Sequence, residues 1–220
     1  MQIYKTSKAR ENIFSKIRKG LSGEGLAMPY PDVEKNFDHI YTEKDISNEE
    51  IFAEAFTALG GKFVFCDNEQ ELMDNIIVLH EDRNWKKLLC SDERILKLFK
   101  NYKIDILQPA DPTIEDAEAC ITGCETLVAR TGSILFSSMQ PFGRTSSVFY
   151  PVHIVFAYAN QITKDVDDGL TALKKKYGNN MPSMISLTTG PSRTADIEKT
   201  LVVGVHGPCE IFCFFINAEE

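Results

Sequence analysis

The chain has 220 residues, with 24 basic and 32 acidic side chains and a formal net charge of -8. This charge excludes a dedicated nucleic-acid binder, because such proteins gain most of their affinity from basic residues that neutralise phosphates. Hydrophobic residues make up 43% of the chain and charged residues 25%, as in an ordinary globular protein and unlike a disordered one. We therefore expect one folded α/β domain.

The cysteines are too few for a disulfide framework in a chain of this length. No apolar core of a signal peptide and no run long enough to span a membrane occurs in the sequence, so we expect a reducing, cytoplasmic location. Three residues separate the cysteines of the two close pairs, whereas zinc and iron-sulfur sites usually begin with a spacing of two. We expect buried free thiols and no resident metal. The six cysteines are Cys66, Cys90, Cys120, Cys124, Cys209 and Cys213.

The first twenty residues predict a basic amphipathic helix, because apolar side chains recur at positions 13, 14, 17 and 21 among lysines and arginines. Such a helix packs on its own domain or binds a membrane or a partner, and we expect the first. Residues 20–47 contain glycines and prolines with little periodicity, which indicates an irregular arm or linker. The expected division is residues 1–47 for helix and arm, and 48–220 for a single α/β domain.

The middle of the chain alternates strands and helices. Ser47 and Glu50 form a capping box that starts a helix, and Gly60 and Gly61 end it. Strands are expected at 62–66, 86–90 and 104–107, and helices at 68–81 and 92–99. This alternation predicts parallel βαβ units in a sheet covered on both faces. Later strands are expected at 120–129, 133–138, 153–158, 184–187, 201–205 and 210–217, with a helix at 164–177.

The two standard nucleotide-phosphate cradles, G-x-G-x-x-G and G-x-x-x-x-G-K-[ST], are missing from the sequence. Residues 188–198, TTGPSRTADIE, instead predict an anion pocket, because they follow a strand and are expected to open a short helix. Gly190 permits close backbone approach, Ser192 or Thr194 can cap the helix, and Arg193 is a planar donor suited to carboxylate or phosphate. The alternative is a plain turn with a surface arginine.

Two further loops, 121–124 and 129–133, each pair a hydroxyl with a glycine and could converge on the same ligand. His206, held in a VHGP turn, is either an acid or base or an ordinary turn histidine. His153 lies inside an apolar strand and is expected in the core. The catalytic candidates are His206 and Glu198. The ligand-binding candidates are Thr122, Gly123, Thr131, Gly132, Ser133, Gly190, Ser192, Arg193, Thr194, Asp196 and Gly207.

Residues 116–217 resemble the lactate utilization protein C family, also called the LUD domain, through ITGCETLVARTGS, PVHIVF and TTGPSRTADIEKTLVVGVHGP. The resemblance implies a fold like that of the sugar-phosphate isomerases and coenzyme A transferases, an open, mixed, mostly parallel α/β sheet with helices on both faces. It implies a role with two iron-sulfur partner proteins in oxidising L-lactate to pyruvate, without a cluster in this chain. Arg130 and Cys120 depart from the family pattern, and a basic group beside the pocket would change the preferred ligand charge.

Three hypotheses follow. The first is a subunit of a lactate-oxidising iron-sulfur system that holds a small carboxylate. The second is a stand-alone enzyme of the related fold, such as a sugar-phosphate isomerase, an acyl-coenzyme A transferase or an ATP-dependent ligase, with Glu125 or Glu198 as the nucleophile of a transferase. The third is a structural or regulatory module whose first helix and arm bind partners.

Overall fold

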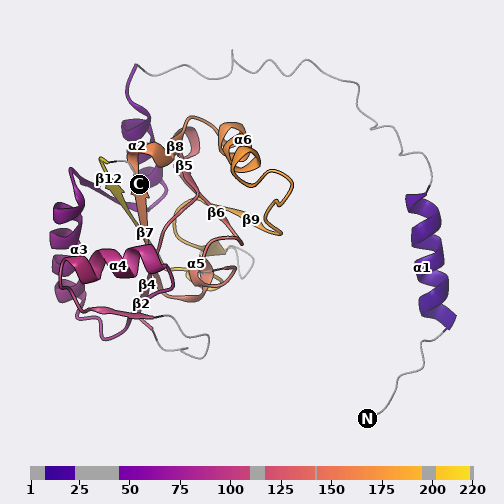
Figure 1. The fold of residues 1–220 in the computed structure, drawn as a ribbon, viewed down its shortest axis with the longest axis horizontal. Coiled ribbons are helices and arrows are strands. Elements are labelled where there is room, and N and C mark those ends of the chain that lie inside the picture. The colour runs from indigo at the N-terminus through magenta and orange to yellow at the C-terminus, as the bar shows by residue number, and fades with distance from the viewer. Residues whose placement is uncertain (1–7, 23–44, 110–116, 142, 195–201, 219–220) are drawn as a thin grey trace, which may run out of the picture. The chain divides into compact units, whose positions relative to one another are not determined.

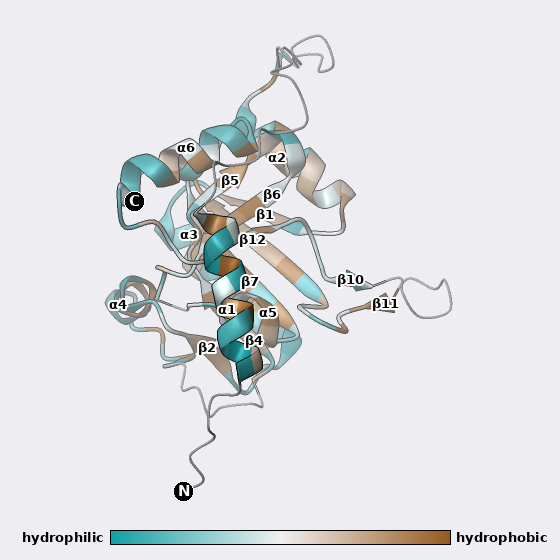
Figure 2. Cartoon of the chain, turned by 90° about the vertical axis from the view of Figure 1, so that its right-hand side faces the viewer, coloured by the Kyte–Doolittle hydropathy of each residue, from teal (hydrophilic) through white to brown (hydrophobic). Residues whose placement is uncertain are grey.

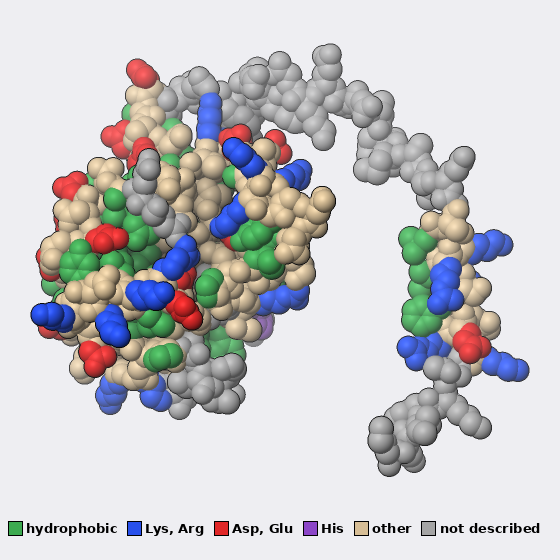
Figure 3. All heavy atoms as spheres, viewed as in Figure 1, with side chains coloured by type: hydrophobic (Ala, Val, Ile, Leu, Met, Phe, Trp, Pro, Cys, Tyr) green, Lys and Arg blue, Asp and Glu red, His purple; other side chains and the backbone are tan. Residues whose placement is uncertain are grey.

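The computed structural model describes residues 8–22, 45–109, 117–141, 143–194 and 202–218 (Figure 1). The chain divides into two units, residues 1–43 and 44–220, and each is described by itself. In the first unit, α1 (Lys8–Leu21) is the predicted basic helix, and its apolar side chains gather along one side (Figure 3). Most of the predicted arm lies outside the described residues. No helix in the described ranges is both long enough and apolar enough to cross a membrane.

The second unit is built on an open, six-stranded sheet whose pairs are all parallel. Its order is β1 (Lys62–Cys66), β12 (Glu210–Ile216), β7 (Val152–Tyr158), β4 (Ala119–Thr122), β2 (Leu88–Cys90) and β3 (Leu107–Pro109). The α/β fold class predicted from the sequence is confirmed. The C-terminal strand β12 lies between β1 and β7, paired in register with both.

A smaller mixed sheet forms from the middle of the chain. Its order is β8 (Ile162–Thr163), β5 (Thr126–Val128), β6 (Ser133–Ser137) and β9 (Ile185–Thr188). The pairs β5–β6 and β6–β9 are antiparallel, and β5–β8 is parallel. The short 3-10 helix Ala129–Thr131 connects β5 to β6, and the 3-10 helix Ala159–Gln161 connects β7 of the large sheet to β8. The predicted strand 120–129 therefore breaks into β4 and β5, because the chain leaves the large sheet at Gly123 and enters the small one.

Helices begin at side-chain caps where the sequence provides them. The predicted capping box is confirmed at α2 (Asn48–Ala58), where Ser47 Oγ accepts from the Glu50 amide and Glu50 Oε2 accepts from the Ser47 amide. Asn68 caps α3 (Glu69–Arg83), Asp92 caps α4 (Glu93–Asn101), and Asp165 caps α6 (Val166–Tyr177). A further short helix is α5 (Ser146–Phe149).

Two apolar layers enclose the large sheet. One contains Leu72 and Ile76 of α3, and Ile95 and Phe99 of α4. The other contains Phe52 and Phe56 of α2 together with side chains of the small sheet. Successive residues of β12 alternate between these layers, as the period of a strand requires. Apolar residues accordingly concentrate in the central strands, whereas α6 is largely hydrophilic (Figure 2).

The helix predicted to open after Gly190 is wrong for the described residues. Arg193–Thr194 form the short strand β10, which pairs antiparallel with β11 (Val202–Val203). The chain returns beside itself at Val202, and backbone pairing with that segment replaces helical hydrogen bonds. Asp196 and Glu198 lie outside the described residues.

Gly132, in the turn between β5 and β6, occupies a position where both the backbone angle and the available space favour glycine. Its φ is 57°, and a Cβ atom there would lie 2.4 Å from the Phe56 backbone nitrogen. We expect Gly132→Ala to lower the free energy of unfolding by more than about 2 kcal/mol, because left-handed strain and a clash with α2 act together. Urea denaturation followed by circular dichroism measures this loss.

Gly143→Ala is the matched control, because Gly143 has a similar φ of 61° but a Cβ atom there would have no neighbouring atom within 4 Å. It should cost about 1 kcal/mol from backbone strain alone. Equal losses in the two variants would show that the packing of this turn on α2 contributes nothing.

Candidate functional site

A pocket of about 350 Å³ lies at the carboxyl edge of the parallel sheet. Residues at or just beyond the ends of four strands line it, namely Glu69 after β1, Asp92 after β2, Gly123 after β4 and Tyr158 of β7. Ligands of open α/β sheets bind at this edge, where the N-termini of the following helices favour negative charge. The other lining residues are Arg94, Ile95, Lys97, Leu98, Asn101, Phe156 and Gln161.

Asp92 and Arg94 form a charged pair in the wall of this pocket. The Asp92 side chain is 2% exposed, and it accepts hydrogen bonds from Arg94 Nε at 3.1 Å and Nη2 at 2.8 Å. Burial alone would raise the pKa of Asp92, but hydrogen bonds from Arg94 hold that pKa below its ordinary value. The ionised carboxylate therefore fixes the plane of a guanidinium group that is itself 61% exposed.

Tyr158 and Glu69 meet on another side of the pocket. The Tyr158 hydroxyl donates to Glu69 Oε1 at 3.4 Å. Burial and the neighbouring Glu69 raise the pKa of Tyr158 to about 12, so the phenol stays protonated at neutral pH. Gln161 holds this strand end, because its side-chain oxygen accepts from the Tyr158 amide and its nitrogen donates to the Cys124 carbonyl.

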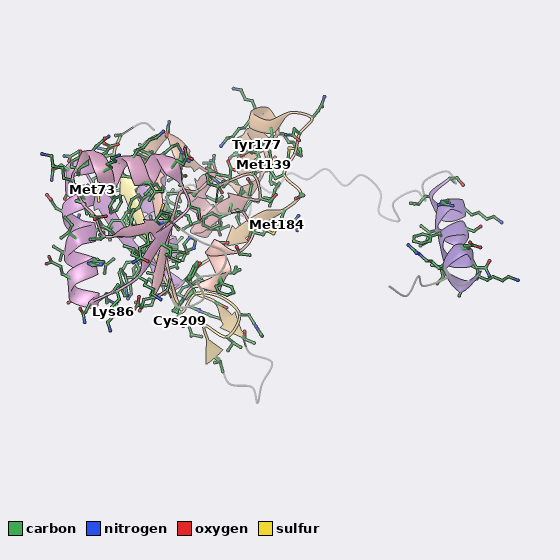
Figure 4. The ribbon with its side chains drawn as sticks, turned by 60° about the horizontal axis from the view of Figure 1, so that its bottom comes forward. Met73, Lys86, Met139, Tyr177, Met184 and Cys209 are labelled. Atoms are coloured by element: carbon green, nitrogen blue, oxygen red, sulfur yellow. The ribbon has the colours of Figure 1, made fainter. Side chains whose placement is uncertain are left out.

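Glu125 lies two residues beyond Gly123, and its side chain is 1% exposed. Its carboxylate accepts from Ser137 Oγ at 2.5 Å, Lys176 Nζ at 2.8 Å and the hydroxyl of Tyr177 at 2.7 Å (Tyr177 is labelled in Figure 4). Burial opposes ionisation, but these donors, Lys176 foremost, keep the pKa of Glu125 below its ordinary value. The network ties the end of α6 to β5 and β6.

The motif loops, residues 129–133, 188–194 and 206–208, lie at the opposite, amino edge of the parallel sheet, around the C-terminus of α2. Ser133 Oγ and Thr189 Oγ1 are 2.8 Å apart, and a Cβ atom on Gly190 would lie 2.7 Å from the Leu59 carbonyl oxygen. Arg193 Nη2 donates to that same carbonyl. The guanidinium therefore caps the negative end of a helix.

The LUD domain family model matches residues 49–216. The chain belongs to the LUD domain family. One relative, named lactate utilization protein C, comes from Halalkalibacterium halodurans and is 23% identical over an alignment of 222 positions, which covers 93% of this chain and 94% of the relative. The protein of the same name from Bacillus subtilis is 34% identical over 96 residues, 43% of this chain and 40% of that relative. The matched segment thus spans less than half of the Bacillus protein.

A crystal structure of a DUF162 family protein from Deinococcus radiodurans is also similar to this LUD protein. The TM-score is 0.58 at 19% sequence identity, with 78% of this chain and 99% of that chain covered. A likeness at this identity shows the fold alone.

The structure separates the site residues predicted from the sequence into two groups. Gly123 lines the carboxyl-edge pocket, and Thr122 ends β4 at that edge. Thr131, Gly132 and Ser133 lie at the other end of the β5–β6 hairpin, as its register shows. The two hydroxyl–glycine loops are therefore not brought together. The second group lies at the amino edge, where the Ser192 amide donates to the Pro208 carbonyl. Besides Thr131, Gly132 and Ser133, it contains Gly190, Ser192, Arg193, Thr194, His206 and Gly207.

Arg130 binds Asp165 through Nε and Nη2, each at 2.7 Å, at the start of α6. It does not line the carboxyl-edge pocket, and its effect on a ligand of the 188–198 segment stays a prediction. One interpretation of the cysteines changes, because Cys209 is exposed, whereas the other five cysteines are buried free thiols as expected. Among the described residues, no group of three or more His, Cys, Asp or Glu side chains is placed to hold a metal.

Four residues of the pocket were not predicted from the sequence, namely Glu69, Asp92, Arg94 and Tyr158. A local signal for Asp92 exists, because an N-cap residue directly after an apolar strand marks a carboxyl strand end in a βαβ unit. Nothing local links the four residues, since they come together only through the order of the strands.

His153 is confirmed as a core residue. It is fully buried, its Nε2 lies 2.7 Å from Thr122 Oγ1, and its Nδ1 has no partner in the described part of the chain. Burial lowers the pKa of His153 to about 3. The Thr122 hydroxyl is thus hydrogen-bonded to a core histidine.

This burial predicts a pH dependence of stability. The pKa of His153 is about 3 in the folded chain against an ordinary value of 6.5, so the unfolded chain binds the proton first and stability falls as the pH drops below about 6.5. Between pH 7 and pH 5 the wild type should lose about 2 kcal/mol more than His153→Gln.

Urea denaturation of both proteins at the two pH values measures this difference, since the carboxylates common to both cancel. His80→Gln, on the partly exposed face of α3, is the control and should follow the wild type. A wild type and a His153→Gln variant with the same pH dependence would contradict a neutral, buried histidine.

Proposed function

We propose that this LUD protein acts in the oxidation of L-lactate to pyruvate with iron-sulfur partner proteins, and that it binds a small carboxylate itself. The family match over residues 49–216 and the relatives named lactate utilization protein C support the pathway. In this proposal the partners carry the electrons and bind the clusters. This chain contributes the binding and orientation of the organic acid.

The carboxyl-edge pocket is the proposed ligand site. Arg94 and Lys97 bring positive charge to its wall, and the buried Asp92 orients the guanidinium. A planar guanidinium matches a carboxylate through two parallel hydrogen bonds. The apolar side chains of Ile95, Leu98 and Phe156 provide a surface for the rest of the acid. The placement of this pair in a cavity is the observation that carries the proposal.

The motif loops are the competing location. Arg193 of these loops donates to the Leu59 carbonyl, and the helix N-terminus expected beside it is replaced by β10 in the described residues. Both features favour a structural role for Arg193 over anion binding.

A stand-alone transferase is less well supported. Its nominated nucleophile Glu125 is buried, and three donors already bind its carboxylate. Hydrogen bonds and a paired ammonium group stabilise the anion and lower its reactivity towards an acyl group. The other nominee, Glu198, lies outside the described residues.

Arginine variants separate the two locations. Arg94→Ala should weaken binding of L-lactate to the purified full chain at least about tenfold, because a charge-assisted hydrogen bond contributes about 1.5–3 kcal/mol. It should lower lactate oxidation by the complete set of proteins accordingly. Arg193→Ala should leave lactate affinity unchanged. Titration followed by NMR or calorimetry gives the dissociation constants.

Lys100→Ala is the matched control, since Lys100 is an exposed cation on the same helix but does not line the pocket. Urea denaturation of each variant checks that the fold is retained. If Arg193→Ala abolishes lactate binding while Arg94→Ala does not, the ligand site belongs to the motif loops.

A further inference from the structure

We propose that Glu69 makes the carboxyl-edge pocket select a 2-hydroxycarboxylate over the corresponding 2-oxocarboxylate, with Tyr158 binding the oxygen that the two acids share. Selection of this kind would favour the reduced substrate over its oxidised product. The inference rests on the proposed function, because it requires that a small carboxylate binds in this pocket.

Glu69 and Tyr158 reach the pocket from different parts of the fold. Glu69 is the first residue of α3, directly beyond β1, and Tyr158 is the last residue of β7. Both line the pocket, and both are partly exposed. The hydroxyl-to-carboxylate distance of 3.4 Å is long for an O–H···O bond, whose usual distance is about 2.7–2.8 Å. A ligand oxygen that contacts both groups would make two shorter bonds in its place.

The two groups have opposite hydrogen-bonding roles. The Tyr158 phenol, whose pKa is raised to about 12, is protonated at neutral pH and donates a hydrogen bond. A carboxylate such as Glu69 accepts one. The hydroxyl of a 2-hydroxy acid is both acceptor and donor, so it satisfies Tyr158 and Glu69 together. The ketone of a 2-oxo acid is an acceptor only, and beside Glu69 it meets a second acceptor.

The positive groups are placed to orient the acid. The charges of Arg94, Asp92 and Glu69 all act on the Tyr158 phenol. The phenol therefore lies close enough to the Asp92–Arg94 pair and to Glu69 to interact electrostatically with each. Arg94 and Lys97 come from α4, whereas Glu69 and Tyr158 come from α3 and β7. A carboxylate held on the α4 side places the neighbouring carbon and its oxygen towards Tyr158 and Glu69.

The test compares L-lactate and pyruvate on the full-length protein. Calorimetric or NMR titrations give the dissociation constants for the wild type, Glu69→Gln and Tyr158→Phe. The wild type should bind lactate at least about tenfold more tightly than pyruvate, as expected when a site leaves an analogue's acceptor unpaired. Glu69→Gln should reduce this ratio at least about tenfold, chiefly by tighter pyruvate binding, because an amide can donate to the ketone.

Two further variants make the assignment specific. Tyr158→Phe should weaken both acids and leave their ratio unchanged, because both oxygens accept from the phenol. Glu93→Gln is the matched control: Glu93 is the first residue of α4, as Glu69 is of α3, but it does not line the pocket. This variant should keep the wild-type ratio.

The outcomes distinguish the two proposals. A wild type that binds neither acid overturns the proposed ligand and, with it, this inference. A wild type that binds both, with the same ratio in Glu69→Gln as in the wild type, overturns the role of Glu69 alone. A Tyr158→Phe variant with unchanged affinities for both acids overturns the role of Tyr158.

Discussion

The insertion of β12 between β1 and β7 is the constraint on which the remaining structure depends. β12 is the last strand of the chain, yet all seven of its residues pair with β7 on one side, and five of them pair with the first strand of the domain on the other. Its side chains enter both apolar layers. β1 is an edge strand, and β12 is its neighbour in the large sheet. The N-terminus of α3, with Glu69, is therefore placed beside Tyr158 only when the C-terminal strand β12 pairs with β1. The pocket is therefore a product of long-range pairing, which costs loop entropy before it is stabilised.

The two edges of the parallel sheet differ in structure, with a cavity at one edge and close backbone packing at the other. At the carboxyl edge, strand ends present Asp92, Gly123 and Tyr158 around a cavity. At the amino edge, close backbone packing dominates: Gly132 and Gly190 have positive φ and lie against α2 with no room for a Cβ atom. The family-like motifs that contain these glycines thus have a sufficient physical reason in packing. Their sequence specificity is not by itself a sign of a ligand, whereas a cavity in which a buried carboxylate orients an exposed guanidinium group is.

Local signals predicted the elements of this fold well, and the assembled site poorly. The capping box at Ser47, the βαβ alternation and the buried His153 follow from a few neighbouring residues, and the structure confirms each. For the described residues, the helix predicted after Gly190 is wrong because Arg193 and Thr194 pair with Val202–Val203, and no local sequence pattern predicts this pairing. The pocket was missed for the same reason, since residues 69, 92, 123 and 158 become neighbours only through strand order. Sequence periodicity reports which face of an element is buried, and not which elements adjoin.

The net charge of -8 does not prevent this protein from binding a small anion. At physiological ionic strength the Debye length is about 8 Å, so exposed charges elsewhere on the surface act weakly inside the pocket. There the ion pair of Asp92 and Arg94 is nearly neutral as a unit, and Lys97 and Glu69 add one charge of each sign. A site balanced in this way does not attract anions by charge alone, so affinity has to come from directed hydrogen bonds and from the helix N-termini at the strand ends. Such a site discriminates by the pattern of donors and acceptors on the ligand more than by its charge.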